Sequence, residues 1–326
     1  FLQLVLSEAG FENGFVSLVM QCISSVSYNI IWNGSKTKNF VLTRGLRQGD
    51  PLSPLLFVLC MDKLSHIICD AMEEGSWRPI YVTKDGPKVS HLLFVDDLLL
   101  FGVAFESQVN CTLKCLDSFR RASGAKVNCA KSSVYFSLRV PNHTKDRIHE
   151  ATGMRLTSEI GRYLRFPLTR NARKGETFRY IIERVRSKLA LWKANCLSIA
   201  GRITLAKSIL SLIPLYPMQV TRIPSSICKE VECLQRNFIW GHDDNSRHYH
   251  PIGWDLITKS KEFGGLGFRN LRSMNKACGA KIAWKLSLGD SSLWAQMLQQ
   301  RYMLRDEDSL LTFYPGDSSL WKFICS

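Results

Sequence analysis

The segment from position 89 to position 101 constrains the fold most, because it is apolar except at Ser90, His91, Asp96 and Asp97. Its branched and aromatic side chains favour strands. The two adjacent aspartates fall near its middle and predict a tight turn between two strands that run back on each other. We therefore expect a buried hairpin with two carboxylates at its tip.

Two neighbouring carboxylates in apolar surroundings repel each other and resist desolvation. Asp96 and Asp97 therefore need either a cation or water. A divalent ion such as Mg²⁺ would satisfy them, because it takes carboxylate and phosphate oxygens as ligands. Taken alone, the pair is equally compatible with an ordinary solvated Asp-Asp turn.

The rest of the chain predicts an α+β fold with an antiparallel sheet in its first half and a helical second half. Asn33-Gly34 is a strong hairpin signal between the first two strands. From Thr177 onward the apolar spacing is helical. In the first half we expect helices at 1–10, 14–26, 55–71 and 109–122, and strands at 28–32, 38–43 and 133–138.

The segment Arg44–Pro54, with the sequence RGLRQGDPLSP, precedes the helix expected at 55–71. Ser53 is expected to cap that buried helix, with Pro54 in its first turn. The glycines allow the backbone to approach a ligand closely, and Arg44, Arg47 and Gln48 offer donors to phosphates or base edges. A loop whose polar residues merely cap the helix would have the same composition.

The formal net charge of +15 lies almost entirely in the second half. Residues 1–150 carry 16 basic and 14 acidic side chains, whereas residues 151–326 carry 27 basic and 14 acidic ones. This division suggests that one part performs chemistry while the other holds a polyanion. From charge alone, a solvated basic helical face without a ligand is equally compatible.

The cysteine content and the hydropathy indicate in which part of the cell the chain is expected. The chain has eleven cysteines, an odd number, and no C-x-x-C pair, which fits a reducing intracellular environment. The longest apolar stretch, 55–61, is far shorter than the roughly 18 residues that a membrane span needs, so we expect no membrane partner.

Together, RGLRQGDPLSP and Phe94-Val95-Asp96-Asp97 resemble the reverse transcriptases of non-LTR (LINE-type) retrotransposons, especially those of plants. The first segment joined to the aspartate hairpin is highly specific for that family. The resemblance runs along essentially the whole chain. It continues through SGAKVNCAKS at 123–132, YLRFPL at 163–168, WK at 192–193, LSIAGR at 197–202 and GGLGF at 264–268.

The resemblance implies a right-hand polymerase with a palm, in which an antiparallel sheet packs with helices, followed by a helical thumb and a helical C-terminal region. Two divalent ions, Mg²⁺ or Mn²⁺, would activate a primer 3′-hydroxyl and stabilise the leaving pyrophosphate. It implies that Asp96 and Asp97 are two of three metal-binding carboxylates. It places Arg44, Arg47, Gln48 and Gly49 against the template and incoming nucleotide. Lys131 would lie near the triphosphate, unless it is simply a solvated lysine.

By the same resemblance, residues 1–165 form truncated fingers and palm, 166–224 a basic thumb-like region and 225–326 a helical connection region. The partners implied are an RNA template, a DNA primer and dNTPs, and the location implied is the nucleus. No oligomeric state is predicted. The candidate contacts to the primer–template backbone are Arg179, Arg184, Arg186, Lys188, Lys193 and Arg202, some of which must simply face solvent.

Three departures from the family pattern qualify this prediction. Residue 1 is Phe, so we expect a fragment whose third catalytic Asp lies upstream and which is inactive alone. Val95 stands where plant relatives usually have Ala, and Arg165 stands where the family generally has Gly. An Arg would strain a tight turn at that place. Two alternatives therefore stay open, a non-catalytic nucleic-acid-binding remnant and a metal-dependent nuclease using the same Asp pair.

Overall fold

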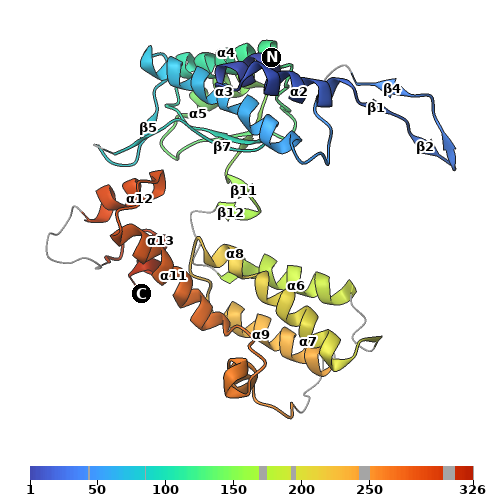
Figure 1. The fold of residues 1–326 in the computed structure, drawn as a ribbon. Helices are drawn as coiled ribbons and strands as arrows, with labels where there is room; N and C mark the ends of the chain where they lie inside the picture. The colour runs from blue at the N-terminus through green and yellow to red at the C-terminus, as the bar shows by residue number, and fades with distance from the viewer. Residues whose placement is uncertain are drawn as a thin grey trace. The chain divides into compact units, whose positions relative to one another are not determined.

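The structure is a computed structural model that describes residues 1–42, 45–84, 86–168, 175–191, 196–241, 250–303 and 313–325. The chain forms two compact units (Figure 1). Unit 1 comprises Phe1–Tyr81 and Lys88–Glu159, and unit 2 comprises Val82–Pro87 and Ile160–Ser326. The finer division into fingers and palm, thumb and connection regions stays a prediction.

Unit 1 contains five helices in its described part, and its core is split into two small clusters. One cluster is centred on Leu6, Val16, Val19 and Leu56, and the other contains Trp77 with residues of two longer helices. The helices expected near 1–10, 14–26, 55–71 and 109–122 are all confirmed. The five are α1 (Leu2–Glu8), α2 (Asn13–Ser24), α3 (Ser53–Glu73), α4 (Glu106–Ser123) and α5 (Asn142–Thr152).

The strands of unit 1 form short two-stranded ladders. The predicted Asn33-Gly34 turn is present, with φ of 48° and 80°, at the end of an arm that extends away from the helices of unit 1 (Figure 1). The antiparallel ladders are β1 (Ser27–Tyr28) with β4 (Phe40–Val41), β2 (Ile31–Trp32) with β3 (Ser35–Lys36), β5 (Ile80–Tyr81) with β6 (Lys88–Val89), and β7 (His91–Phe94) with β8 (Asp97–Leu100).

One ladder corrects the expectation of a purely antiparallel sheet. Strand β9 (Ser133–Tyr135) pairs in parallel with β10 (Arg155–Thr157), and α5 forms the crossover between them. Parallel neighbours need such a crossover. The α5 sequence NHTKDRIHEAT buries only Ile148, so apolar spacing gave almost no signal for this helix. Gly153, which ends α5 with φ of 63°, is the stop signal that could have revealed it.

Helix α3 differs from the expectation in two respects. Ser53 is its first residue rather than its cap, and Leu52 occupies the N-cap without a side-chain hydrogen bond. Asp50 Oδ1 instead accepts from the backbone N–H of Leu52 at 2.8 Å, which is an Asx-type turn. The helix is also amphipathic rather than buried throughout, since Leu55 is 64% exposed and Val58 is 47% exposed.

Unit 2 has a large continuous core to which helices from Phe178 to Phe323 contribute. An antiparallel hairpin, β11 (Gly161–Tyr163) with β12 (Phe166–Leu168), precedes these helices. The other elements are η1 (Gly175–Phe178), α6 (Arg179–Leu191), α7 (Ile199–Ser208), η3 (Leu210–Leu212), α8 (Leu215–Met218), α9 (Ser225–Trp240), α10 (Trp254–Ile257), η4 (Lys261–Phe263), α11 (Leu271–Ser287), α12 (Leu293–Leu298), η5 (Gln299–Met303) and α13 (Ser319–Ile324).

One segment of the described chain, Ile199–Met218, is long and apolar enough by composition to cross a membrane, with a mean hydropathy of 1.3. In the structure this segment comprises α7, η3 and α8. Its Ala206, Leu210 and Met218 are fully buried in the core of unit 2. Core packing therefore accounts for at least part of its apolar composition, and the absence of a membrane partner stays a prediction.

Candidate functional site

Asp96 and Asp97 lie at the tip of the β7–β8 hairpin, as predicted. The ladder pairs Phe94 with Asp97, so the loop consists of Val95 and Asp96 alone. Val95 has φ of 53°, a conformation that β-branched residues rarely adopt. The backbone therefore reverses in two residues, and the two carboxylates are held on consecutive positions of one turn.

The hairpin is not buried, which corrects the sequence expectation. Both aspartates are exposed, and among the flanking apolar residues Leu92 is 38% and Phe94 is 55% exposed. The reason is that β7 and β8 pair only with each other within the described chain. Leu98 and Leu100 pack against the core of unit 1, while the other side chains of the hairpin are left partly open.

His91, at the start of β7, connects the hairpin to α3. Its Nε2 lies 2.6 Å from the Ser65 hydroxyl of α3, and its Nδ1 lies 2.9 Å from the Ser90 hydroxyl. Burial lowers the pKa of His91, because the charged imidazolium loses solvation. A neutral ring donates from one nitrogen and accepts at the other, which suits two hydroxyl partners. His91 is not among the site residues predicted from the sequence, where a lone His in an apolar strand is its only signal.

The loop before α3 holds Arg47, Gln48 and Gly49, all of them exposed. Gly49 has φ of 88°, which a glycine adopts without strain. The preceding Leu46 packs against the small core formed by α1, α2 and α3 and anchors the loop there. Arg44 lies outside the described residues. The loop thus presents polar groups to solvent in the same unit as the aspartates.

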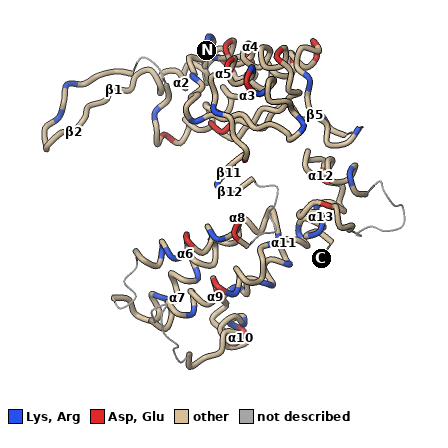
Figure 2. Tube along the Cα trace, turned by 180° about the vertical axis from the view of Figure 1, so that it is seen from behind, with Lys and Arg blue, Asp and Glu red and all other residues tan. Residues whose placement is uncertain are grey.

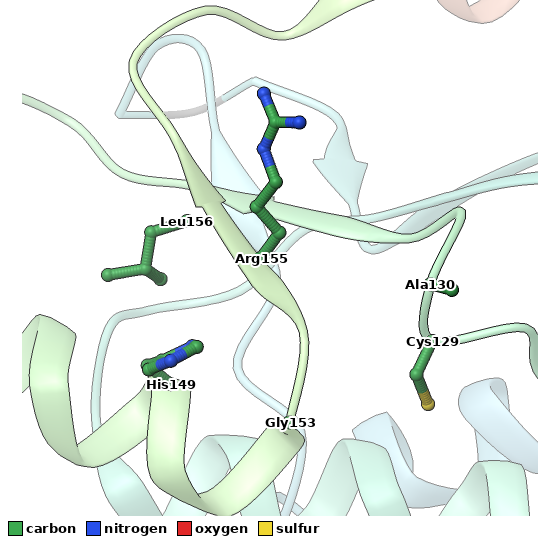
Figure 3. Close-up of a pocket in the computed structure, with 6 residues that line it drawn as sticks. All are labelled: Cys129, Ala130, His149, Gly153, Arg155 and Leu156. Carbon is green, nitrogen blue, oxygen red and sulfur yellow. The ribbon is translucent and has the colours of Figure 1, made fainter.

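Lys131 is exposed in a turn before β9, where its backbone N–H donates to Asn128. Next to this turn is an open hollow of about 600 Å³ between the turn, α5 and β10 (Figure 3). The Arg155 side chain extends away from His149 and Cys129 in that view. Nδ1 of His149 already lies 2.7 Å from the carbonyl oxygen of Met154. The polar groups that line this hollow therefore do not converge on a common ligand.

The residues of α6 that are predicted to bind the primer–template backbone all face solvent, because the opposite side of α6 is buried. Ile181, Ile182 and Val185 occupy the core of unit 2. Figure 2 shows the Lys and Arg positions of α6. Arg186 contacts Glu230 of α9 at 3.3 Å, so its charge is partly compensated. Lys193 lies outside the described residues. The exposed set is Arg179, Arg184, Arg186 and Lys188.

Arg202 of α7 lies in a different setting. It is half-buried, and its guanidinium lies so close to the Cα of Gly241, the residue that ends α9, that a side chain there would collide with it. A cation at the C-terminal end of a helix is favoured by the helix dipole. The structure thus gives Arg202 a packing role against α9, and its role at a primer–template backbone stays a prediction.

Among the described residues, potential metal donors occur only in small groups. In the residues that the structure describes, no set of three His, Cys, Asp or Glu side chains is arranged to share an ion. Asp96 and Asp97 have no ion pair with any described Lys or Arg, so their oxygens are available to a cation. Oxygen donors of this type suit Mg²⁺ or Mn²⁺, and the pair supplies part of such a site.

The predicted strain at Arg165 is confirmed. The β11–β12 ladder pairs Tyr163 with Phe166, and the two-residue loop Leu164-Arg165 has φ of 49° and 66°. Positive φ at both positions is typical of a type I′ turn, for which Asn-Gly is preferred. A glycine at 165 would adopt this conformation without strain.

Comparison with known proteins identifies the family of this chain. The sequence profile of the reverse transcriptase (RNA-dependent DNA polymerase) family matches residues 9–180, a span that includes the Arg47–Gly49 loop, the aspartate hairpin and Lys131. An Arabidopsis thaliana protein that is named, provisionally, a ribonuclease H protein is 37% identical over 151 residues, which are 46% of this chain and 24% of that protein.

Two further relatives are retrovirus-related Pol polyproteins. That of the type-1 retrotransposable element R2 from Popillia japonica is 34% identical over 91 residues, 28% of this chain and 14% of the relative. That of the type-2 element R2DM from Drosophila melanogaster is 33% identical over 123 residues, 37% of this chain and 11% of the relative. The chain thus spans a quarter or less of these three relatives. Since the family profile covers more than half of the chain, this chain belongs to the reverse transcriptase family, of the non-LTR retrotransposon type.

Proposed function

We propose that this chain is the palm and thumb part of an RNA-directed DNA polymerase, with an RNA template, a DNA primer and dNTPs as partners. The observation that carries the proposal is the exposed turn on which Asp96 and Asp97 stand side by side within the family-matched residues. Two divalent ions, when bound, would supply the charge that activates the primer 3′-hydroxyl and stabilises the leaving group.

The residues of the chain would contribute positioning. Asp96 in the two-residue loop and Asp97 at the start of β8 are both exposed, and the His91–Ser65 contact fixes the hairpin to α3. The loop that leads into the same helix presents Arg47, Gln48 and Gly49, and we propose that these groups contact the template and the nucleotide. We assign Lys131 to the triphosphate on the resemblance. Arg44 would join this set.

The exposed cations of α6 would hold the primer–template duplex. Exposed Arg and Lys side chains bind phosphates without reading sequence. Arg179, Arg184 and Lys188 suit this role best, since Arg186 is engaged with Glu230. By the resemblance, such an enzyme would act in the nucleus, where it would copy its template at the integration site.

A second candidate function is a nucleic-acid-binding remnant without catalysis. The small number of metal donors favours it, because the described residues bring only two carboxylates to the hairpin and no third donor. In the family a third carboxylate completes the metal site. We therefore propose that the chain is inactive unless a third carboxylate is supplied to this hairpin.

Primer extension on an RNA template with Mg²⁺ or Mn²⁺ tests both candidates. The chain is compared with the same chain joined to an upstream segment of a relative that carries the third carboxylate. We expect extension only in the joined form. RNA binding without extension in either form would support the remnant, and cleavage of the RNA without extension would indicate a nuclease.

The matched variants are D96N/D97N and E73Q/E74Q in the joined form. Both remove two adjacent exposed carboxylates from unit 1. The first should lower the extension rate by about 10³-fold or more, since the metal-binding charge is lost. The second should leave the rate unchanged. Competent extension by D96N/D97N would refute the polymerase assignment to this site.

A further inference from the structure

A second feature of unit 2 lies outside the family-matched residues and outside the predicted thumb contacts. It is a cavity of about 500 Å³ where the loop at 221–224, the start of α9, α11 and α13 come together. Four of its lining side chains are cationic, and the lining includes neither Asp nor Glu. The four are Arg222, Arg272, Lys276 and Lys322.

The cations come from three separate elements and converge on one hollow. Arg272 and Lys276 stand one helical turn apart on α11, Arg222 lies on the loop before α9, and Lys322 lies on α13. The ammonium group of Lys322 donates to the carbonyl oxygen of Pro315. Cations gathered around a concave surface focus a positive potential there. Guanidinium groups can also hold a phosphate with two parallel hydrogen bonds.

A buried side chain holds the walls of the cavity in place. Asn275 of α11 is 6% exposed, accepts from the backbone N–H of Ile223 at 3.2 Å and donates to the Ile223 carbonyl at 2.8 Å. This pair of hydrogen bonds fixes the loop that carries Arg222 against the helix that carries Arg272 and Lys276. Glu232, a nearby carboxylate, accepts from the N–H of Leu271 and helps to fix the start of α11.

The beginning of α9 adds to the positive character of the cavity. Pro224 occupies its N-cap and makes no side-chain hydrogen bond, and Ser225 of the first turn lines the cavity. The first N–H groups of a helix lack partners within that helix and carry partial positive charge. The N-terminus of α9 therefore adds to the positive potential in the cavity, but the four side-chain cations supply most of it.

We propose that this cavity binds a phosphate group of a nucleic-acid backbone and forms an anchoring point separate from the aspartate hairpin. The inference rests on the proposed nucleic-acid binding of this chain, but it does not depend on polymerisation. A nucleic acid fits better than a small anion alone, because residues 151–326 carry 27 basic against 14 acidic side chains and attract a polyanion.

The test is fluorescence anisotropy of the full chain with a labelled RNA–DNA hybrid at several KCl concentrations. The variant is R272Q/K276Q, and the matched control is K281Q/K285Q on the same helix. All four residues are exposed, and the two control lysines do not line the cavity. Both changes remove the same charge, so any difference between them reports the cavity. Far-UV circular dichroism of each variant checks that the fold is kept.

We expect R272Q/K276Q to weaken binding about tenfold near 0.1 M salt and to reduce the slope of log K against log[KCl] by about one, because one phosphate contact is lost. The control should change the slope by much less. Equal effects of the two variants would overturn the cavity assignment alone. No binding by the unmodified chain would instead overturn the proposed nucleic-acid function.

Inorganic phosphate serves as the second probe, because a free anion would have the same chemistry. Thermal unfolding of the unmodified chain and of R272Q/K276Q is followed with and without 10 mM phosphate. Stabilisation of the unmodified chain only, together with an unchanged hybrid affinity in the variant, would show a small-anion site and contradict the backbone anchor. Loss of hybrid affinity in the variant supports it.

Discussion

Unit 1 and unit 2 differ in how their functional groups are supported. Unit 2 has one large core and a second, smaller cluster around Trp321, and its candidate binding helices bury their inner faces in these clusters. Unit 1 has two small clusters, and its two adjacent aspartates lie at the tip of a hairpin whose strands pair only with each other in the described chain. Its β2 strand leaves Ile31 66% and Trp32 72% exposed.

The candidate metal-binding aspartates and most of the net positive charge therefore belong to different compact units, each with its own hydrophobic clusters. The basic surface depends on helices that are rigid because they are well packed. The aspartate turn depends on fewer contacts, chiefly His91 with Ser65 and the packing of Leu98 and Leu100. Substitutions in one unit should therefore leave the other unit's stability unchanged.

The largest expected effect on stability comes from cavities in the two cores. Ile181 in unit 2 and Ile68 in unit 1 are both fully buried. I181A and I68A should each cost about 2–5 kcal/mol, because transfer energy is lost and a cavity remains. Hydrogen exchange should show lost protection only in the unit that carries the change. Equal loss in both units would show that they unfold together.

The next effect concerns a turn of unit 2. A Cβ at Gly265 would lie 2.1 Å from the backbone oxygen of Lys259, so the backbone would have to move. G265A should cost about 1–3 kcal/mol in urea unfolding. A Cβ at Gly316 would meet no atom within 4 Å, and the φ of Gly316 lies outside the left-handed region. G316A is therefore the matched control and should leave the stability almost unchanged. A neutral G265A would contradict the close approach.

Replacing one residue by glycine in each of the two strained hairpin loops should raise the free energy of unfolding by about 1 kcal/mol. R165G in unit 2 and V95G in unit 1 replace residues with φ of 66° and 53° by a residue that adopts these angles freely. Thermal unfolding measures the gain. R165A retains a Cβ and should give little of it. If R165A stabilised as much as R165G, the charge of Arg165 rather than its backbone strain would be responsible.

The smallest effect is a pH dependence of unit 1. Burial holds the pKa of His91 below its unfolded value of about 6.5, so the unfolded chain binds more protons as the solution is acidified. The contribution of neutral His91 to the free energy of unfolding is complete above pH 6.5 and is lost as the pH falls through the pKa of the folded state. The ring is only half buried, so solvent screening keeps the effect below about 1 kcal/mol.

Urea midpoints at pH 7.5 and pH 5.5 measure this dependence for the chain and for H91Q. The glutamine can keep hydrogen bonds to Ser65 and Ser90 but does not titrate in this range. We expect a smaller pH difference in H91Q. The same pH difference in both proteins would assign the dependence to other groups.

Local signals predicted the turns well. The Asn33-Gly34 turn and the aspartate hairpin are both present. These features depend on backbone angles that a few neighbouring residues determine. The family was also predictable, because its motifs are contiguous in the sequence.

Features that depend on distant residues were not predictable. The parallel β9–β10 pair joins segments through a polar helix with one buried residue. The exposure of the aspartate hairpin depends on which strands pair with it, which composition does not reveal. Arg222, Arg272, Lys276 and Lys322 are scattered over 101 positions of the sequence and meet only after the helices of unit 2 have packed.

The most direct measurement is single-turnover primer extension by the chain joined to an upstream segment with the third carboxylate, over a range of protein concentrations. We expect D96N/D97N to lower the saturated extension rate about 10³-fold while the concentration for half-saturation stays the same. We expect R272Q/K276Q to raise that concentration about tenfold and to leave the saturated rate unchanged. A D96N/D97N protein that extends at the unmodified rate would show that the aspartate hairpin is not the catalytic site.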